Sequence, residues 1–498
     1  MNKGSKILVG LLLIAVGVVV GKFFFSSDSG ANLLPPVRYT NESTGRGDGS
    51  GADVAARVTG EIIEVKDGES IQKAVTKAKP GDLIRVYPGT YNETVYIDKD
   101  DISLQGVIEN GEWPTLDGQK QLNDAVLYSG NGFLIENFKI IKYKGNAIMG
   151  QAGNNYVIRN NWVIDTGVYG IFPQYGKNGL VAGNVLSEIE DAAIYVGMCD
   201  NIDVINNEVF DNVAGIEIEN SRHALVENNY VHDNTGGVLV FITPGLPIKT
   251  CYDVIVRNNF IVNNNHKNFG APGSLVAGIP KGTGILIMAA DDVIVENNII
   301  SGNDNSGITI TDMAFAGIQL SKDPESEPNP DRIVLLDNFM SNNGNNPIDD
   351  VKALMMTQLS EIGPDIIAVG GGSGSIRNKD RYRSFGLGNF AQAQIADTRS
   401  VKTFQLDKPV EPRIIKPAER SKLTYYAVCA GCHAYNMRMI GPPTQIIQVL
   451  YKDNPQGIAD YIKAPVHKRD DYPEMPPQDY IDEETRLEVA KFMLNIKR

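Results

Sequence analysis

The chain has 498 residues, a formal net charge of −14 and a pI near 5.0. Nucleic-acid binding depends on Lys and Arg that neutralise phosphates, so this acidic balance argues against nucleic acid as a partner. It also argues against an anionic membrane surface as the main partner, and the length predicts two or three domains.

The N-terminal segment is the first predicted element. Residues 7–21 form an uncharged run of 15 residues, which is short for a membrane span of ~20 residues. The run reaches 19 residues if Lys22 snorkels to the interface. We therefore predict that residues 1–25 are an uncleaved anchor, with the chain on the periplasmic side of a bacterial cytoplasmic membrane. The alternative is a cleaved signal peptide that leaves the protein in the periplasm. Residues 26–57 are predicted to be a flexible linker.

The long middle, residues 58–370, contains short apolar-alternating segments separated by Asn and Gly. The Asn pairs, with one Gly-Asn equivalent, are Asn160-Asn161, Gly183-Asn184, Asn206-Asn207, Asn228-Asn229, Asn258-Asn259 and Asn297-Asn298. Their successive offsets are 23, 23, 22, 30 and 39 residues. A period of 22–23 with Asn at one turn is typical of a parallel β-helix, in which coils stack ~4.8 Å apart and the amides form a ladder. The longer offsets predict loops near 244–250 and 263–282, and a third bulge is predicted at 312–332.

The start of this region adds a family resemblance. Residues 68–75 predict a short capping helix, and Pro80-Gly81-Asp82 then leads into the apolar run from Leu83 to Tyr91. Together with the Asn repeat, this resembles the right-handed parallel β-helix proteins of the pectate-lyase-like superfamily. The resemblance implies the fold but no single activity, because such folds host lyases, hydrolases, epimerases, adhesins and maturation factors. The acid cluster and catalytic base of pectate lyases are not matched residue by residue, and the D-P-H-E run of alginate-type epimerases is absent.

Aligning the coils on the Asn pairs predicts a candidate site. The aligned outward columns are Phe172, Tyr195, Glu217 and Leu239, and then Gln174, Gly197, Glu219 and Phe241. Arg222 and His223 follow at the next turn. Aromatic faces stack on sugar rings and paired carboxylates perform acid–base chemistry, so Glu217, Glu219, Arg222 and His223 are predicted catalytic residues of a sugar groove. The alternative is a solvated outer face whose charges prevent aggregation.

Other reactive side chains in the middle region receive structural interpretations. Cys199 and Cys251 fall in one column two coils apart, roughly 9–10 Å, so we expect both to be free thiols. His232 and His266 are predicted to be lone surface histidines rather than metal ligands, because no close His pair occurs.

The C-terminal part carries the motif Cys429-Ala430-Gly431-Cys432-His433. C-x-x-C-H is the pattern that attaches a c-type haem, because two thiols one helical turn apart reach the two vinyl groups of a porphyrin. Met475 follows His433 by 42 residues in a proline-flanked loop, and Asp482 predicts the N-cap of a helix that runs to Arg498.

With the Ile440-Gly441-Pro442 run, these features resemble class I cytochrome c over residues 416–498. The resemblance implies one covalent haem c, with thioethers at Cys429 and Cys432. It also implies that His433 and Met475 ligate the iron. Residues 371–415 are then a linker between the two domains.

The whole chain is accordingly predicted to be a parallel β-helix solenoid followed by a small all-α cytochrome c domain. The main prediction is an exported electron-transfer protein with a redox partner protein, whose β-helix binds polysaccharide or a partner. One alternative is a polysaccharide-modifying enzyme (lyase, hydrolase or epimerase) with an accessory cytochrome. Another is a periplasmic cofactor-maturation factor, which predicts tight copper binding.

Overall fold

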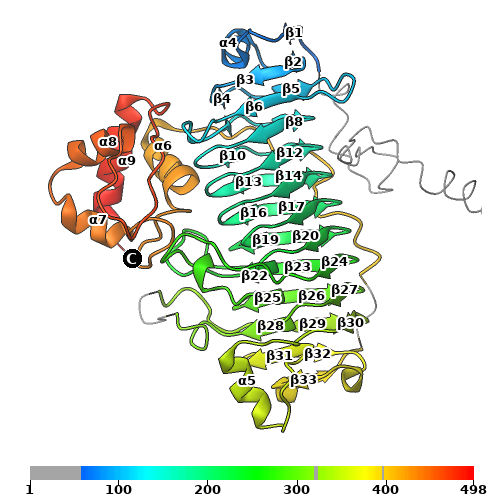
Figure 1. The fold of residues 1–498 in the computed structure, drawn as a ribbon. Coiled ribbons are helices and arrows are strands. Elements are labelled where there is room, and N and C mark those ends of the chain that lie inside the picture. The colour runs from blue at the N-terminus through cyan, green and yellow to red at the C-terminus, as the bar shows by residue number, and fades with distance from the viewer. Residues whose placement is uncertain (1–57, 319–322, 395–397, 498) are drawn as a thin grey trace, which may run out of the picture. The chain divides into compact units, whose positions relative to one another are not determined.

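The computed structural model describes residues 58–318, 323–394 and 398–497, and Figure 1 shows its stacked strands and the helices α4 to α9. Within these residues the strands form three parallel sheets, here named A, B and C, of 13, 10 and 11 strands. From β2 to β31 each coil contributes one strand to each sheet, so the predicted right-handed parallel β-helix is confirmed.

The strand bounds are as follows. Sheet A contains β1 (Ile62–Val65), β2 (Leu83–Val86), β5 (Ser103–Gly106), β8 (Leu134–Glu136), β11 (Val157–Arg159), β14 (Lys177–Ala182), β17 (Asp200–Ile205), β20 (Arg222–Glu227), β23 (Tyr252–Arg257), β26 (Asp291–Glu296), β29 (Ile333–Leu336), β32 (Gly374–Ile376) and β34 (Phe390–Gln392). Sheet B contains β3 (Gly89–Tyr91), β6 (Pro114–Asp117), β9 (Lys139–Ile141), β12 (Trp162–Ile164), β15 (Val185–Ser187), β18 (Glu208–Phe210), β21 (Tyr230–His232), β24 (Phe260–Val262), β27 (Ile299–Ser301) and β30 (Phe339–Ser341). Sheet C contains β4 (Val95–Ile97), β7 (Val126–Tyr128), β10 (Ile148–Gln151), β13 (Tyr169–Gln174), β16 (Ala192–Gly197), β19 (Ala214–Glu219), β22 (Gly236–Phe241), β25 (Thr283–Met288), β28 (Ser306–Thr311), β31 (Ile366–Val369) and β33 (Ser384–Phe385).

Helices cap the solenoid and follow it. The cap α4 (Ile71–Lys77) begins at the N-cap Ser70, whose side chain accepts a hydrogen bond from the Lys73 N–H. The other helices are α5 (Asp349–Met356), α6 (Pro417–Thr424), the π-helical turn η5 (Tyr425–Cys429), α7 (Thr444–Leu450), α8 (Pro455–Lys463) and α9 (Glu483–Asn495). Asp482 is the N-cap of α9, as predicted.

The Asn pairs form the turn between sheets A and B. The first residue of each pair adopts a left-handed conformation, for example Gly183 (φ 65°) and Asn206 (φ 58°). The second is buried, and its amide joins successive coils: Asn184 Nδ2 donates to Asn207 Oδ1 at 3.0 Å and to the Ile158 carbonyl oxygen at 3.0 Å. The predicted amide ladder is therefore present.

A second ladder, not predicted, joins sheets B and C. Its members are Asn212, Asn234, Asn264, Asn303 and Asn343, and the side-chain amide of each of the first four donates to the Oδ1 of the next. Their offsets of 22, 30, 39 and 40 residues repeat those of the first ladder, which is the signal that identifies them.

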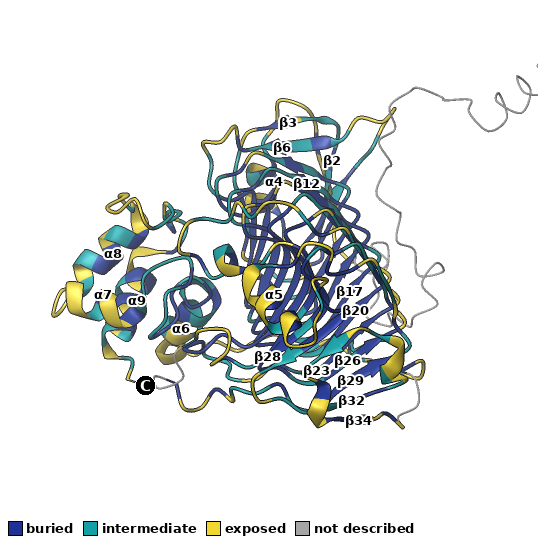
Figure 2. Ribbon diagram, turned by 60° about the horizontal axis from the view of Figure 1, so that its bottom comes forward, coloured by how far each residue is buried: buried dark blue, intermediate teal, exposed yellow. Residues whose placement is uncertain are grey.

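The interior is filled by aliphatic columns. Ile171, Ile194, Ile216 and Val238 stack in register on sheet C and are fully buried, as the alternation predicts. In Figure 2 the stacked strands are largely dark blue, whereas exposed residues gather on turns and on α5.

Parallel pairing continues past residue 370, through β34. The chain then returns along sheet A as an irregular segment, residues 398–413, which we call the strap. Its backbone N–H groups donate to side chains of three coils, progressively closer to the N-terminus: Thr398 to Glu296, Phe404 to Asp203, and Val410 to Asn155, all at 2.8–3.0 Å.

The predicted N-terminal anchor, residues 1–25, lies outside the described residues. In the part of the chain that is described, no helix is long and apolar enough to cross a membrane. The described residues thus give no support to the predicted anchored location on the periplasmic side of the cytoplasmic membrane.

Candidate active site

The two predicted outward columns on sheet C exist in the predicted register. Tyr195 pairs with Glu217, which pairs with Leu239, and Gly197 pairs with Glu219, which pairs with Phe241. These columns are not exposed to solvent, however, because Glu217 and Glu219 are each only 1% exposed.

The C-terminal helical region, which begins at α6, covers these columns on sheet C. The side chain of Gln174 on β13 donates a hydrogen bond to the carbonyl oxygen of Tyr426 at 3.1 Å. The Tyr435 N–H donates to the carbonyl oxygen of Gly245 at 3.0 Å. Gly431 packs closely at this contact, because a Cβ there would lie 2.6 Å from the Gln174 amide nitrogen. Contacts between segments so far apart in sequence leave no trace in the repeat pattern.

The covered face holds an acidic cluster, which we define as Asp191, Glu217 and Glu219. Burial raises the pKa of Glu219 to about 8 and that of Asp191 to about 8. Burial, reinforced by the charge of Asp191, also raises the pKa of Glu217 well above its usual value. Burial therefore favours the protonated form of all three carboxyl groups.

Two oxygens of this cluster are unusual. Glu217 Oε1 and Glu219 Oε1 are buried without a hydrogen-bond partner, and among the described residues no basic side chain forms an ion pair with either. Buried polar atoms without partners cost free energy, so they are typical of functional sites.

Tyr195 and Gly197 fix the position of Glu219. The Tyr195 hydroxyl donates a hydrogen bond to Glu219 Oε2. A Cβ at position 197 would lie 2.3 Å from the Tyr195 ring, so glycine lets the ring lie across this part of the strand. The ring of Phe172 packs edge-on against Tyr195 with centroids 4.7 Å apart.

A cavity of about 400 Å³ adjoins this face at the turns between sheets C and A. Two lining residues, Tyr175 and Met198, directly follow Gln174 and Gly197 on the covered strands. Its charged lining residues are Lys177, Asp200, Arg222, Arg413, Glu419 and Lys422. Four cations face two anions there, although the chain as a whole is strongly acidic.

The remaining two predicted residues lie on β20, away from the acidic cluster. Arg222 and His223 both contact Asp200: His223 Nδ1 lies 2.7 Å and Arg222 3.5 Å from its carboxylate. Burial works to raise the pKa of Asp200, but His223, with Arg222 and Lys177, outweighs it and holds the pKa below its usual value. The structure therefore separates the four predicted residues into a buried acid pair and a partly exposed basic pair.

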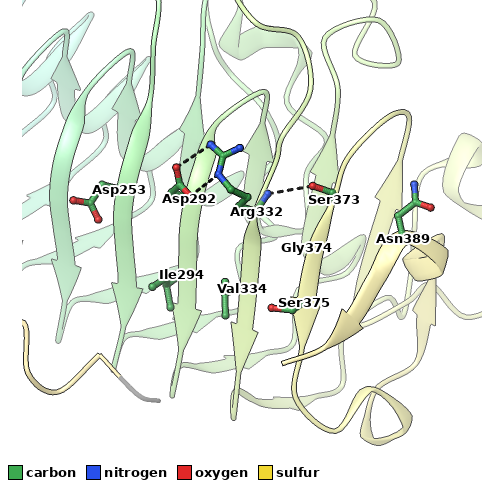
Figure 3. Close-up of a pocket in the computed structure, with 9 residues that line it drawn as sticks. All are labelled: Asp253, Asp292, Ile294, Arg332, Val334, Ser373, Gly374, Ser375 and Asn389. Atoms are coloured by element: carbon green, nitrogen blue, oxygen red, sulfur yellow. Dashed lines mark hydrogen bonds and ion pairs between the residues drawn. The ribbon is translucent and has the colours of Figure 1, made fainter. Parts of the chain in front are cut away.

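A larger cavity of about 700 Å³ lies on sheet A, and one of its lining residues, Asp253, has a carboxylate oxygen 3.8 Å from His223 Nε2. Figure 3 shows Asp253 and Asp292 near one end of the strands, with Ile294 beside them on β26. Arg332 pairs with Asp292 at 2.7 Å and so neutralises one of the two carboxylates that line this cavity.

Near this cavity, Asp291, Glu327 and Asp331 place carboxylate oxygens within 4.8 Å of one another. The sequence did not single them out. Exposed acids often lie together without an ion, so we assign them no role.

The C-x-x-C-H segment forms a compact turn at the end of η5. The N–H groups of Cys432 and His433 both donate to the Cys429 carbonyl oxygen, at 3.2 and 2.9 Å. His433 Nδ1 lies 2.8 Å from the Pro442 carbonyl oxygen, and burial lowers its pKa. Met475 packs against the same hydrophobic cluster as Cys429. Burial raises the pKa of both thiols to about 12, so they are uncharged.

The other predicted cysteines and histidines have structural surroundings. Cys199 and Cys251 are free and buried, as expected. His232 contacts Glu208 and Asp233, and the ring of His266 packs against Phe269.

Comparisons with known proteins agree on the fold. Residues 123–251 match the family model described as right handed beta helix region. No curated protein matches the sequence. The A-module of a mannuronan C-5 epimerase of Azotobacter vinelandii is 14% identical, with a TM-score of 0.45, over 68% of this chain and 89% of that chain. A family 28 exopolygalacturonase of Yersinia enterocolitica is 12% identical, with a TM-score of 0.40, over 64% of this chain and 71% of that chain. An alginate lyase of a Paenibacillus species is 14% identical, with a TM-score of 0.33, over 67% of this chain and 98% of that chain.

The class defined so far is a right-handed parallel β-helix protein with C-terminal helices. By their names, the similar solved structures are enzymes that act on polysaccharides. None of the comparisons supports the predicted electron-transfer protein. The cytochrome c domain, the haem c cofactor and the redox partner are therefore not retained. The five-residue motif specifies only a turn that brings two thiols and an imidazole together; that turn is present, but it does not by itself define a cofactor.

Proposed function

We propose that this protein is a polysaccharide-modifying enzyme whose acid–base chemistry is carried out by Glu217 and Glu219. The observation that carries the proposal is the buried, unpaired acidic cluster on sheet C. A carboxyl group with a pKa of about 8 is protonated at neutral pH and is suited to donate a proton to a leaving oxygen.

The surroundings support an assignment of roles. Glu219, oriented by Tyr195 and with Oε1 unpartnered, is the proposed proton donor. Glu217, two residues earlier on the same strand face, is the proposed second carboxyl group. Arg222 lines the adjoining cavity and is proposed to bind substrate, and His223 is proposed to hold Asp200 in place beside it. The helical cover excludes water, which strengthens electrostatic interactions at the acids.

The test uses the full-length protein with a panel of neutral and uronic-acid polysaccharides. New chain ends, unsaturated sugars and changed sugar configuration are measured for wild type, Glu217→Gln and Glu219→Gln. The matched control is Glu361→Gln, a change at an exposed acid on the loop after α5. We expect turnover by wild type and by the control, and a loss of roughly 10²-fold or more in each glutamine variant. Retained turnover in Glu219→Gln would refute the assignment of the site.

A further inference from the structure

The outer face of sheet B differs from the other two sheet faces. Sheet A is crossed by the strap and sheet C is covered by helices, whereas sheet B presents large exposed rings. Tyr230, Phe260 and Phe339 are 43%, 51% and 54% exposed. They occupy the same position on β21, β24 and β30, as the strand register places them in one column with Ile299. Exposed aromatic side chains in a row indicate a binding surface.

Further rings continue this column and the one beside it. We define the aromatic face as Trp162, Phe210, Tyr230, His232, Phe260 and Phe339. His232 stacks on Tyr230 with centroids 3.9 Å apart, and on Phe210 at 5.2 Å with the rings tilted by only 9°. From β12 to β30 the face crosses six coil steps, roughly 29 Å at the spacing of parallel strands.

An acidic row runs beside the aromatic face. Asp165, Glu188, Asp211 and Asp233 directly follow successive strands of sheet B, all with positive φ. Backbone hydrogen bonds connect the coils at this row; the N–H of Glu188 donates to the carbonyl oxygen of Asp211 at 3.2 Å. Asp165 is ion-paired with Lys120, whereas Glu188, Asp211 and Asp233 form no ion pair with Lys or Arg among the described residues. These three carboxylates repel an anionic polymer or an anionic membrane surface, while their oxygens accept hydrogen bonds from hydroxyl groups.

Charge and shape together select one occupant. We propose that the aromatic face binds a neutral polysaccharide chain that lies along the solenoid axis. The apolar C–H faces of its sugar rings pack on Tyr230, Phe260 and Phe339, as apolar groups do on aromatic planes. Its hydroxyl groups donate to Glu208 and Asp233, the carboxylates that contact His232. The proposal rests on the proposed function only for the choice of a polysaccharide as ligand.

The test measures depletion of full-length protein by microcrystalline cellulose and by insoluble xylan, with calcium alginate beads as the anionic comparison. Tyr230→Ala/Phe260→Ala removes two exposed rings. The matched control is Phe315→Ala, since Phe315 is 55% exposed but lies on the loop after β28. We expect the double variant to bind the neutral polymers at least about tenfold more weakly, and the control to bind as wild type. Circular dichroism and thermal midpoints verify that both variants fold.

Each other outcome has a defined meaning. Unchanged binding in the double variant, or binding to alginate alone, would overturn the inference. A wild-type dimer that the double variant converts to a monomer, without polymer binding, would assign the face to a second copy and also overturn it. Glu219→Gln separates the two proposals: loss of turnover with cellulose binding retained leaves both intact. Polymer binding by wild type without any turnover would reject the proposed function and leave this inference standing.

Discussion

Replacing Glu219 by glutamine is predicted to stabilise the protein at alkaline pH while it abolishes turnover. Burial raises the pKa of this carboxyl group from 4.5 to about 8, which corresponds to a cost of about 5 kcal/mol for its charged form. Between these two values the native state holds a proton that the unfolded chain has released. Wild-type stability therefore falls as the pH rises from 4.5, and the full cost of this group is reached above pH 8.

Glutamine keeps the shape and the acceptor oxygen for the Tyr195 hydroxyl, but it does not titrate. The variant therefore lacks the part of the fall in unfolding free energy that the ionisation of Glu219 causes. Relative to wild type, its free energy of unfolding is expected to change little at pH 5 and to rise by up to about 5 kcal/mol at pH 9. Asp191 and Glu217 still titrate in the variant, so some decline remains.

The assay is urea unfolding at pH 5, 7 and 9, followed by circular dichroism, for wild type, Glu219→Gln and Glu361→Gln. The free energy of unfolding of the exposed control, Glu361→Gln, is expected to equal that of wild type at every pH. If Glu219→Gln loses stability in parallel with wild type up to pH 9, the carboxyl group is not held protonated by burial. The reasoning from the covered sheet face would then fail, together with the assignment of Glu219 as proton donor.

Three further changes test other parts of the structure. Asn229→Ala removes a buried amide that is hydrogen-bonded to both neighbouring coils, and it should lower the free energy of unfolding in urea by roughly 2–5 kcal/mol. The control Asn228→Gly changes a residue in the left-handed conformation, which glycine adopts readily, and should leave that free energy almost unchanged. Burial works to lower the pKa of His232, but its two carboxylate partners outweigh it and hold the pKa above 6.5. The contribution of His232 to the free energy of unfolding should thus be complete below pH 6.5 and be lost as the pH rises through the native pKa. Urea unfolding of His232→Gln and wild type at pH 5.5 and 8.5 checks this, since the variant should be less stable than wild type by a larger amount at pH 5.5. Gly197→Ala should displace the Tyr195 ring and lower turnover with little loss of helical or strand content by circular dichroism, and full activity would contradict the role given to that ring.

The repeat made the solenoid predictable from the sequence. An Asn at one fixed turn has a local cause, since a left-handed residue must precede a buried amide, and this requirement recurs with every coil. The alternation along each strand then decided which side chains face inward, so the columns through Glu217 and Glu219 were predicted in the correct register. The second ladder obeys the same offsets, but single Asn residues such as Asn212 were less conspicuous than Asn pairs.

Burial of the candidate site could not be read from the same pattern. Alternation distinguishes the inside of a solenoid from its outside, but it carries no information about which later segment covers the outside. The strap illustrates this, because its backbone bonds to side chains such as Asp203 and Glu296 and has no periodicity of its own. The C-x-x-C-H turn was located correctly in sequence, yet a short motif did not specify that its Gly431 packs against Gln174 of the β-helix.

The separation of the acidic cluster from the aromatic face has a consequence for how a polymer would be processed. The two surfaces lie on different sheets, which meet at the turn that contains the second Asn ladder. A chain held on sheet B gains no transition-state stabilisation from that contact, but other parts of the same polymer are held at a high effective concentration near the cavity beside sheet C. Loss of Tyr230 and Phe260 should therefore reduce turnover of an insoluble polymer and leave turnover of short soluble oligosaccharides unchanged. Equal losses on both substrates would place these rings in direct contact with the reacting sugar, which their position on sheet B does not allow.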